Sequence, residues 1–161
     1  FGIMDRFSAF ATMMDTLFEF SSVSGVNQSI PRTYGTEDVM YMAEVHLLRD
    51  IRDTENASVT SLAEAHGKSK SAITQLVNKL EKKKLLKKDS MPGSRNILLS
   101  LTDKGYTVAE YHDEFDKAEY SNILAGLPDY SEEDFQKITD LMQIIIDGSK
   151  QAIAEKKEQA K

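Results

Sequence analysis

The chain has 161 residues, of which 40% are hydrophobic and 29% are charged, a composition that suits one folded domain with extensions and excludes a wholly disordered chain. No apolar stretch approaches the roughly 20 residues that span a bilayer, so we expect no membrane partner and a cytoplasmic location. The sequence has no cysteine, which excludes disulfides, thiolate metal sites and cysteine nucleophiles.

The net charge of −6 hides a strong asymmetry along the chain. Residues 68–104 hold ten lysines and arginines against three acidic residues, a charge of +7, whereas the rest of the chain has a charge of −13. A basic segment within an acidic chain is typical of a DNA-binding module, although a solvated lysine-rich face would give the same count.

The N-terminal part of the chain predicts two helices separated by a long connection. Apolar residues recur at helical spacing over residues 4–21, whereas residues 21–36 are rich in Ser, Asn and Gly and predict a loop. A second helix is predicted over residues 37–53, with Thr36 as its N-cap, and a polar loop follows over residues 53–58.

Two further helices are joined by a tight turn. A short helix over residues 61–66, capped by Thr60, ends at Gly67, which supplies the positive φ that such a turn needs. Ser69 caps the next helix, over residues 70–83, and its apolar residues recur at i, i+3, i+4 and i+7 as Ile73, Leu76, Val77 and Leu80. The opposite face is polar and basic, so the pair has the pattern of a helix-turn-helix.

A β-hairpin is predicted directly after this pair of helices. Short strands over residues 85–88 and 97–101 flank a turn that contains Pro92 and Gly93. A helix-turn-helix followed by a hairpin is a winged helix.

Two long helices complete the chain. Thr102 caps a helix predicted over residues 103–125, and Ser131 opens a last helix that runs to about residue 157. The predicted fold class is therefore mainly α with a small β-hairpin wing, a winged helix-turn-helix with further helices before and after it.

Four motifs follow one another in and after the helix-turn-helix: Thr60-Ser61-Leu62-Ala63-Glu64, the stretch from Ser69 to Lys83, the pair Leu85-Leu86, and Leu101-Thr102-Asp103-Lys104-Gly105. Together they resemble the MarR family of winged-helix transcription regulators. The resemblance implies a homodimer, with residues 1–36 as N-terminal dimerisation helix and connection, 37–102 as DNA-binding lobe and 103–161 as C-terminal dimerisation helices. The wing departs from the family, because Gly93-Ser94 precede Arg95 where an acidic residue is usual.

The function that this resemblance implies is sequence-specific regulation of transcription, by default repression. A homodimer would bind a pseudo-palindromic DNA operator and be released by a small ligand. The predicted DNA-binding residues are Lys68, Ser69, Lys70, Ser71, Thr74, Gln75, Lys79 and Arg95. Hydroxyl and amide groups suit base edges, lysines suit phosphates, and an arginine in the wing suits a narrow minor groove. We interpret Lys83 and Lys84 instead as solvated lysines at a helix end.

No cofactor is required, but a small organic effector or zinc is expected to regulate binding. The resemblance places an organic ligand in a crevice lined by His46, Tyr111 and His112. His112 and Asp116 are four residues apart on a helix and can therefore face one point. In the zinc-sensing branch of the family, metal ligands fall at His46, His112 and Asp116, although that branch has a histidine at the last position. Glu19 or another acidic residue of the first helix would complete the set, and packed histidines without a ligand are the alternative.

Catalytic motifs are absent from the sequence, and we predict no enzymatic activity. Gly67-Lys68-Ser69 resembles the end of a phosphate-binding loop, but Leu62 stands where that loop needs a glycine. A winged-helix module that binds protein remains an alternative function. Steeply salt-dependent binding to a palindromic duplex would distinguish a DNA-binding regulator from such a module.

Overall fold

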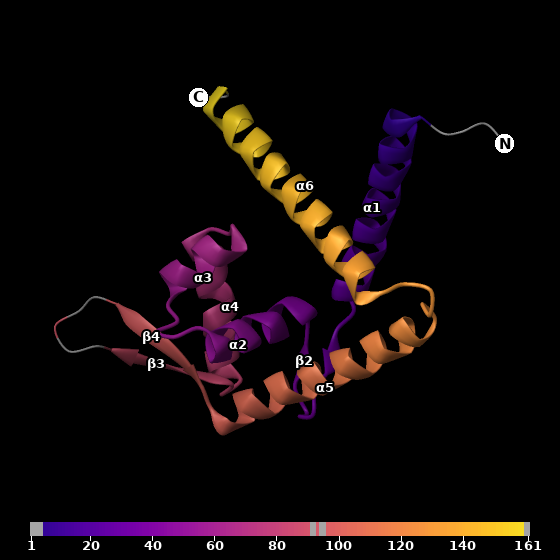
Figure 1. Cartoon of the computed structure of the whole chain (residues 1–161). Coiled ribbons are helices and arrows are strands. Elements are labelled where there is room, and N and C mark those ends of the chain that lie inside the picture. The colour runs from indigo at the N-terminus through magenta and orange to yellow at the C-terminus, as the bar shows by residue number, and fades with distance from the viewer. Residues whose placement is uncertain (1–4, 91–92, 94–95, 160–161) are drawn as a thin grey trace. The chain divides into compact units, whose positions relative to one another are not determined.

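The structure is a computed structural model that describes residues 5–90, 93 and 96–159 (Figure 1). The chain divides into two compact units, the first reaching to Asp116 and the second starting at Lys117. The elements in chain order are α1 (Arg6–Gln28), β1 (Arg32–Thr33), β2 (Val39–Met40), α2 (Met42–Asp53), α3 (Val59–His66), α4 (Lys70–Lys82), β3 (Leu86–Ser90), β4 (Ile97–Leu101), α5 (Asp103–Ala125) and α6 (Glu132–Gln159).

Helix α1 is longer than its sequence pattern predicts. Asp5 caps it by accepting a hydrogen bond of 2.9 Å from the backbone N–H of Ser8. The predicted connection over residues 21–36 is wrong for its first part, since the helix continues to Gln28 through Gly25. Ser, Asn and Gly lower helix propensity by less than about 1 kcal/mol each, so they do not end a helix by themselves.

Helix α2 starts five residues later than predicted. Val39 and Met40 instead form a strand that pairs antiparallel with Thr33 and Arg32, and Tyr41 rather than Thr36 is the N-cap. This pairing brings the fully buried Met40 into the core. The predicted end of the helix at Asp53 is confirmed.

The helix-turn-helix is confirmed, and its turn has the expected chemistry. Helix α3 starts slightly earlier than predicted because Ser58, not Thr60, accepts a hydrogen bond of 3.1 Å from the N–H of Ser61. Gly67 follows α3 in the left-handed conformation with a φ of 59°. Ser69 caps α4 by accepting a hydrogen bond of 3.1 Å from the N–H of Ala72.

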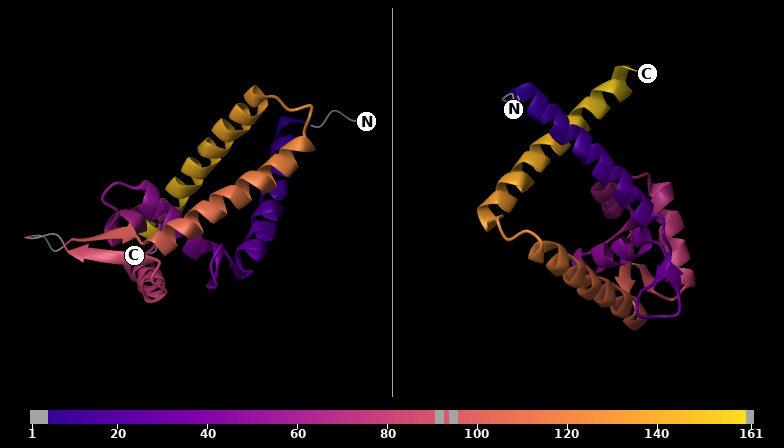
Figure 2. Two further views of the ribbon diagram at one scale, coloured as in Figure 1. Left: turned by 90° about the horizontal axis from the view of Figure 1, so that it is seen from below. Right: turned by 90° about the vertical axis from the view of Figure 1, so that its right-hand side faces the viewer.

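The predicted wing is also present. Strands β3 and β4 pair antiparallel, with Leu86 opposite Leu101 and Ser90 opposite Ile97. The hairpin extends away from the helices of the lobe in Figure 1 and in the left view of Figure 2. Its second strand is also held from outside, because the N–H of Leu99 donates a hydrogen bond of 2.8 Å to the carbonyl oxygen of Ala57, in the loop before α3.

One hydrophobic core joins α2, α3, α4, the hairpin and the start of α5. Its largest fully buried apolar side chains are Tyr34, Met40, Leu47, Leu48, Leu62, Ile73, Leu80 and Leu85. Helix α5 begins as predicted after Thr102, whose hydroxyl donates to the carbonyl oxygen of Lys84 at 2.7 Å and accepts from the N–H of Gly105 at 3.1 Å.

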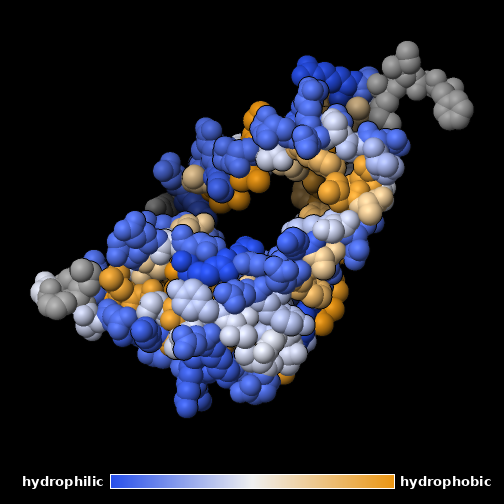
Figure 3. All heavy atoms as spheres, turned by 60° about the horizontal axis from the view of Figure 1, so that its bottom comes forward, coloured by the Kyte–Doolittle hydropathy of each residue, from blue (hydrophilic) through white to orange (hydrophobic). Residues whose placement is uncertain are grey.

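The long helices α1 and α6 contain no buried residue. Several of their large apolar side chains are well exposed, among them Phe18 (69%), Phe20 (70%) and Ile144 (70%). Hydrophobic residues accordingly reach the surface among hydrophilic ones in Figure 3. Despite this apolar surface, no helix in the described part of the chain is long and apolar enough to cross a membrane.

Candidate nucleic-acid interface and effector crevice

The outer face of α4 is the candidate nucleic-acid interface. Ile73, Val77 and Leu80 anchor one side of the helix in the core, with at most 1% of each exposed. The opposite side is therefore turned outward, and it carries the predicted residues Lys70, Ser71, Thr74, Gln75 and Lys79. The predicted residues Lys68 and Ser69 lie just before the helix, and all seven are exposed. Seven of the eight predicted DNA-binding residues are thus exposed in or directly before α4, whereas Arg95 lies outside the described residues.

Two hydroxyl groups on this surface already have backbone partners. The Ser69 hydroxyl caps α4, and the Thr74 hydroxyl donates a hydrogen bond of 2.7 Å to the carbonyl oxygen of Lys70. Ser69 therefore serves first to start the helix, and Thr74 retains acceptor capacity only. Gln75 can still both donate and accept through its amide, as reading a base edge requires.

The basic residues at the end of α4 are not all solvated. The interpretation of Lys83 as a solvated lysine is wrong: its side chain is 20% exposed and donates to the carboxylate of Glu44 at 3.0 Å. Lys84 is exposed and has a positive φ of 60°, at the point where the chain leaves the helix for β3. In the wing, Asp89 accepts a hydrogen bond of 3.2 Å from the hydroxyl of Ser100.

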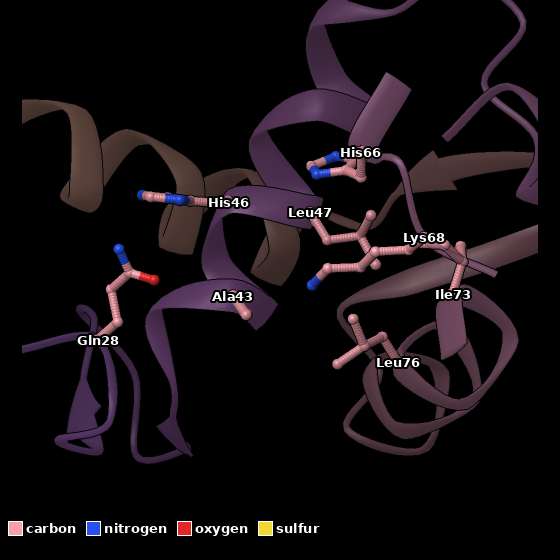
Figure 4. Close-up of a pocket in the computed structure, with 8 residues that line it drawn as sticks. All are labelled: Gln28, Ala43, His46, Leu47, His66, Lys68, Ile73 and Leu76. Atoms are coloured by element: carbon pink, nitrogen blue, oxygen red, sulfur yellow. The ribbon is translucent and has the colours of Figure 1, made fainter. Parts of the chain in front are cut away.

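A cavity of about 190 Å³ lies between α2 and the helix-turn-helix (Figure 4). Its lining residues come from four helices and the turn after α3: Gln28, Ala43, His46, Leu47, His66, Lys68, Ile73 and Leu76. The walls are apolar where α2 faces α4, and two imidazoles, one ammonium and one amide give it a polar side. His66 is oriented by Asp50, whose Oδ2 lies 2.8 Å from its Nε2.

Only one of the three predicted crevice residues lines this cavity. His46 does so, and its ring lies 4.9 Å from the ring of His112, centroid to centroid. His112 is 1% exposed and is not among the lining residues. Tyr111 is half exposed and lies against Gly35 instead.

His112 belongs to a buried polar cluster with incomplete hydrogen bonding. Its Nε2 lies 3.3 Å from Oδ2 of Asp116 without hydrogen-bond geometry, and within the described residues neither ring nitrogen has a hydrogen-bond partner. The buried hydroxyl of Tyr34, whose ring meets the His112 ring edge-on at 5.7 Å, also lacks one. Burial lowers the pKa of both His112 and His46, which favours the neutral imidazole.

The predicted metal ligands lie close to one another but do not form a complete site. Across the described residues, no three His, Asp or Glu side chains form a group that could hold a metal ion. Asp116 also lies 3.9 Å from Arg49, and Glu19 is exposed on α1. The structure therefore places His112 beside Asp116 and His46, without further side chains in the described part of the chain that would complete a metal site.

Comparison with known proteins supports the winged-helix architecture. Residues 40–97 match the model of the MarR family. FabT of Streptococcus pneumoniae, solved in complex with DNA, has a TM-score of 0.68 at 22% identity, over 86% of this chain and 98% of FabT. ZitR of Lactococcus lactis, described as a zinc-responsive MarR family member, has a TM-score of 0.63 at 19% identity, over 87% of this chain and 98% of ZitR.

A third similar structure is the adhesin competence repressor AdcR of Streptococcus pyogenes. Its TM-score is 0.60 at 17% identity, over 85% of this chain and 95% of AdcR. Comparison with curated proteins gives no match. The fold and site thus define a winged-helix protein, and the resemblance to the MarR family is confirmed over residues 40–97.

Sequence reasoning missed the most deeply buried charged residue of the site. Glu44 is 1% exposed and lies between α2 and α4. The available signal was weak. A glutamate three residues after an N-cap commonly accepts a hydrogen bond from the backbone N–H of the N-cap residue, and it does so on exposed helices too. Glu44 accepts such a bond from the N–H of Tyr41 at 2.9 Å, so its position in the sequence does not reveal that it is buried.

Proposed function

We propose that this protein is a sequence-specific DNA-binding transcriptional regulator that acts as a homodimer and represses its target genes. The observation that carries the proposal is the exposed polar and basic face of α4, whose other side is fixed in the core. A helix held in this way enters a major groove with its first turns toward the base edges. FabT, a protein of similar fold, was solved with DNA, and AdcR is named as a repressor.

The residues of this face take two roles in the proposal. Gln75 and Ser71 read base edges, while Lys68 and Lys70 contact phosphates and set the register of the protein on the duplex. The sequence predicts a phosphate contact for Lys79 as well. In the structure, the ammonium of Lys79 also lies 3.2 Å from the carboxylate of Glu44.

Homodimerisation follows from the exposed apolar side chains of the long helices. Neither α1 nor α6 buries any residue within one chain. Large apolar surfaces of this kind mark protein interfaces. Two copies of the lobe related by a two-fold axis would bind half-sites about 34 Å apart.

The experiment that tests DNA binding is selection from a random duplex pool, followed by fluorescence anisotropy of the enriched duplex over a range of salt. We expect a palindromic sequence and an affinity that falls steeply with salt. Gln75→Ala should relax the preference at one base pair of each half-site, where a good contact discriminates by about 1–3 kcal/mol. Gln151→Ala, at an exposed position of α6, is the matched control.

Failure to enrich any sequence, together with weak binding at every salt concentration, would overturn the proposal. The alternative of a winged-helix module that binds protein would then lead.

Release of DNA by a small ligand is the second part of the proposal. The cavity beside α4 supports it, because Ile73 and Leu76 of α4 form part of its wall. A ligand that binds there changes how α4 packs on α2 and so competes with the arrangement that binds DNA. The ammonium of Lys68 and the imidazoles of His46 and His66 suit an organic anion.

Zinc is a second candidate effector, favoured by one specific observation. Two ligands of a tetrahedral zinc ion, with bonds of about 2.0–2.1 Å, lie about 3.3 Å apart. Nε2 of His112 and Oδ2 of Asp116 are separated by 3.3 Å, and both nitrogens of that buried ring lack hydrogen bonds from the described residues. ZitR is described as zinc-responsive, and zinc bound here would link α5 to α2 through His46.

Calorimetric titration of the metal-free protein with Zn²⁺ tests this candidate. We expect tight binding that His112→Ala abolishes and that His66→Ala leaves intact, since His66 pairs with Asp50 instead. Absence of tight binding by the unmodified chain, or equal affinity in His112→Ala, removes zinc and leaves the organic effector.

A further inference from the structure

Glu44 is a buried carboxylate that neither the DNA face nor the cavity uses. Only 1% of it is exposed. Its Oε2 accepts a hydrogen bond of 2.9 Å from the N–H of Tyr41 and lies 3.2 Å from Nζ of Lys79, while its Oε1 accepts from Nζ of Lys83 at 3.0 Å. A charge buried in this way is stable only with such partners, so the carboxylate and the two lysines form one unit.

The two lysines come from the last turns of α4 and its C-cap, whereas Glu44 lies in the first turn of α2. Lys83 also donates to the carbonyl oxygen of Val39 in β2 at 2.9 Å. Lys79 lies over the ring of Tyr41, with its Nζ 5.4 Å from the ring centroid. These contacts tie the C-terminal end of α4 to the start of α2 and to β2.

The same end of α4 is held from the wing. Lys88 of β3 donates to Oδ1 of Asn78 at 2.7 Å and to Oε2 of Glu81 at 2.6 Å. The N-terminal half of α4, in contrast, carries the polar outer face and lines the cavity through Ile73 and Leu76. The fixed end of the helix is therefore the end farther from the predicted base contacts.

We propose that Glu44 is a positioning residue for DNA recognition. It holds the C-terminal half of α4 against α2, and Lys79 and Lys83 serve as its counter-ions instead of binding phosphates. This inference rests on the proposed function, since it assigns a role to residues around the DNA-binding helix. It also replaces the expectation that Lys79 contacts a phosphate.

The salt dependence of DNA binding distinguishes a lysine that contacts a phosphate from a lysine that serves as counter-ion of Glu44. Each phosphate contact contributes about 0.9 to the slope of log K against log salt, so a variant that loses one contact has a shallower slope. We expect Lys79→Met to weaken binding by about tenfold at an unchanged slope, because the helix is misplaced. Lys70→Met should make the slope shallower by about 0.9, and Lys82→Met, an exposed neighbour, controls for the loss of one positive charge. A slope in Lys79→Met as shallow as that in Lys70→Met would overturn the proposal.

Hydrogen exchange of the free protein tests the positioning role without DNA. Glu44→Gln and Lys79→Met should each increase the exchange rate of amides in the last two turns of α4 by about tenfold, with little change in α3. Glu64→Gln, an exposed position on α3, is the matched control for Glu44→Gln. Unchanged exchange in the folded Lys79→Met protein contradicts the positioning role. If the unmodified protein binds no duplex but these variants loosen α4, the proposed function fails, and with it the role in DNA recognition, while the packing of α4 on α2 by Glu44 is supported.

Discussion

At the scale of single residues, Gly105 is the glycine with the least room for a side chain among those in the described part of the chain. A Cβ on Gly105 would lie 1.9 Å from the carbonyl oxygen of Leu85 and 3.3 Å from the Leu101 side chain. Because Leu85 is itself fully buried, the backbone cannot simply move away. We expect Gly105→Ala to lower the free energy of unfolding by about 1–3 kcal/mol, measured by urea denaturation.

Gly148 provides the matched control for this exchange. It lies within α6, and a Cβ there would meet no atom within 4 Å. Gly148→Ala should therefore raise the free energy of unfolding by about 0.5–1 kcal/mol, because alanine restricts the unfolded chain and favours the helix. Equal effects at both positions would contradict the close approach at Gly105.

Glu44 gives the protein a predictable response to acid. Burial alone would raise the pKa of Glu44, but the hydrogen bond from Tyr41 and the ion pairs with Lys83 and Lys79 outweigh burial and hold it below its ordinary value of 4.5. Its contribution to stability is therefore present above about pH 4.5 and is lost as the pH falls through the lowered value.

We expect the difference in unfolding free energy between the unmodified protein and Glu44→Gln to shrink from pH 7 to pH 3.5, measured by urea denaturation. The same exchange at the exposed Glu55 provides the baseline for removal of one carboxylate. A difference that stays constant over this range would show that the pKa of Glu44 is not lowered.

Sequence patterns predict which residues are buried in a helix more readily than which charges pair across the fold. The apolar stripe of α4 was predicted correctly because it depends only on local spacing. The burial of Glu44 depends on Lys83, 39 residues later in the chain, so no local pattern contains it. For the same reason Lys83 was interpreted wrongly as solvated.

At the scale of elements, two of the helix starts with a side-chain cap were predicted correctly, whereas α3 is capped by Ser58 instead of the predicted Thr60. Ser69 and Thr102 were both identified as caps, and α4 and α5 begin directly after them. The start of α2 was missed because Val39 fits the helical spacing of the apolar residues that follow it, whereas Val39 and Met40 pair with β1 in the structure. Strands of two residues leave almost no periodic signal.

Ser69 offers a test of how far its cap supports α4. Replacement of the hydroxyl leaves the N–H of Ala72 without its partner, so Ser69→Ala should cost about 1 kcal/mol of stability. Ser69→Asp should restore most of it, because aspartate is an equally good N-cap and favours the positive end of the helix dipole. Thermal unfolding followed by circular dichroism compares the three proteins, and a loss in Ser69→Asp equal to that in Ser69→Ala would exclude capping as the cause.

At the scale of the whole molecule, charge counted along the sequence overstates what the surface presents. Four lysines of the basic segment pair with acidic residues: Lys79 and Lys83 with Glu44, Lys88 with Glu81, and Lys104 with Glu37 and Asp38. The net charge of +7 therefore identifies the segment that contains the helix-turn-helix and the wing, but it overestimates the number of lysines that are free to contact DNA. Within the described residues, the exposed lysines of this segment without an ion pair are Lys68 and Lys70 at the start of α4, together with Lys82, Lys84 and Lys87.

The exposed apolar side chains of α6 predict how the oligomeric state responds to mutation. We expect a dimer in analytical ultracentrifugation, and Ile144→Asp should shift it toward monomer because a charge replaces a side chain that is 70% exposed in the single chain. Ser149→Asp adds the same charge on the same helix without removing apolar surface and should leave the dimer intact. A monomeric unmodified protein at micromolar concentration would contradict the predicted assembly.

The hydrogen bond from Leu99 to Ala57 has a consequence for how the wing tolerates insertions and deletions. Side chains along a strand alternate between faces, so a slip of one residue would turn Leu99 and Leu101 outward and Ser100 inward. The loop before α3 prevents this slip, because it fixes β4 from outside the hairpin. The segment between Ser90 and Ile97 can therefore change in length, and with it the reach of the wing, while the strands keep their alignment and the core keeps its composition.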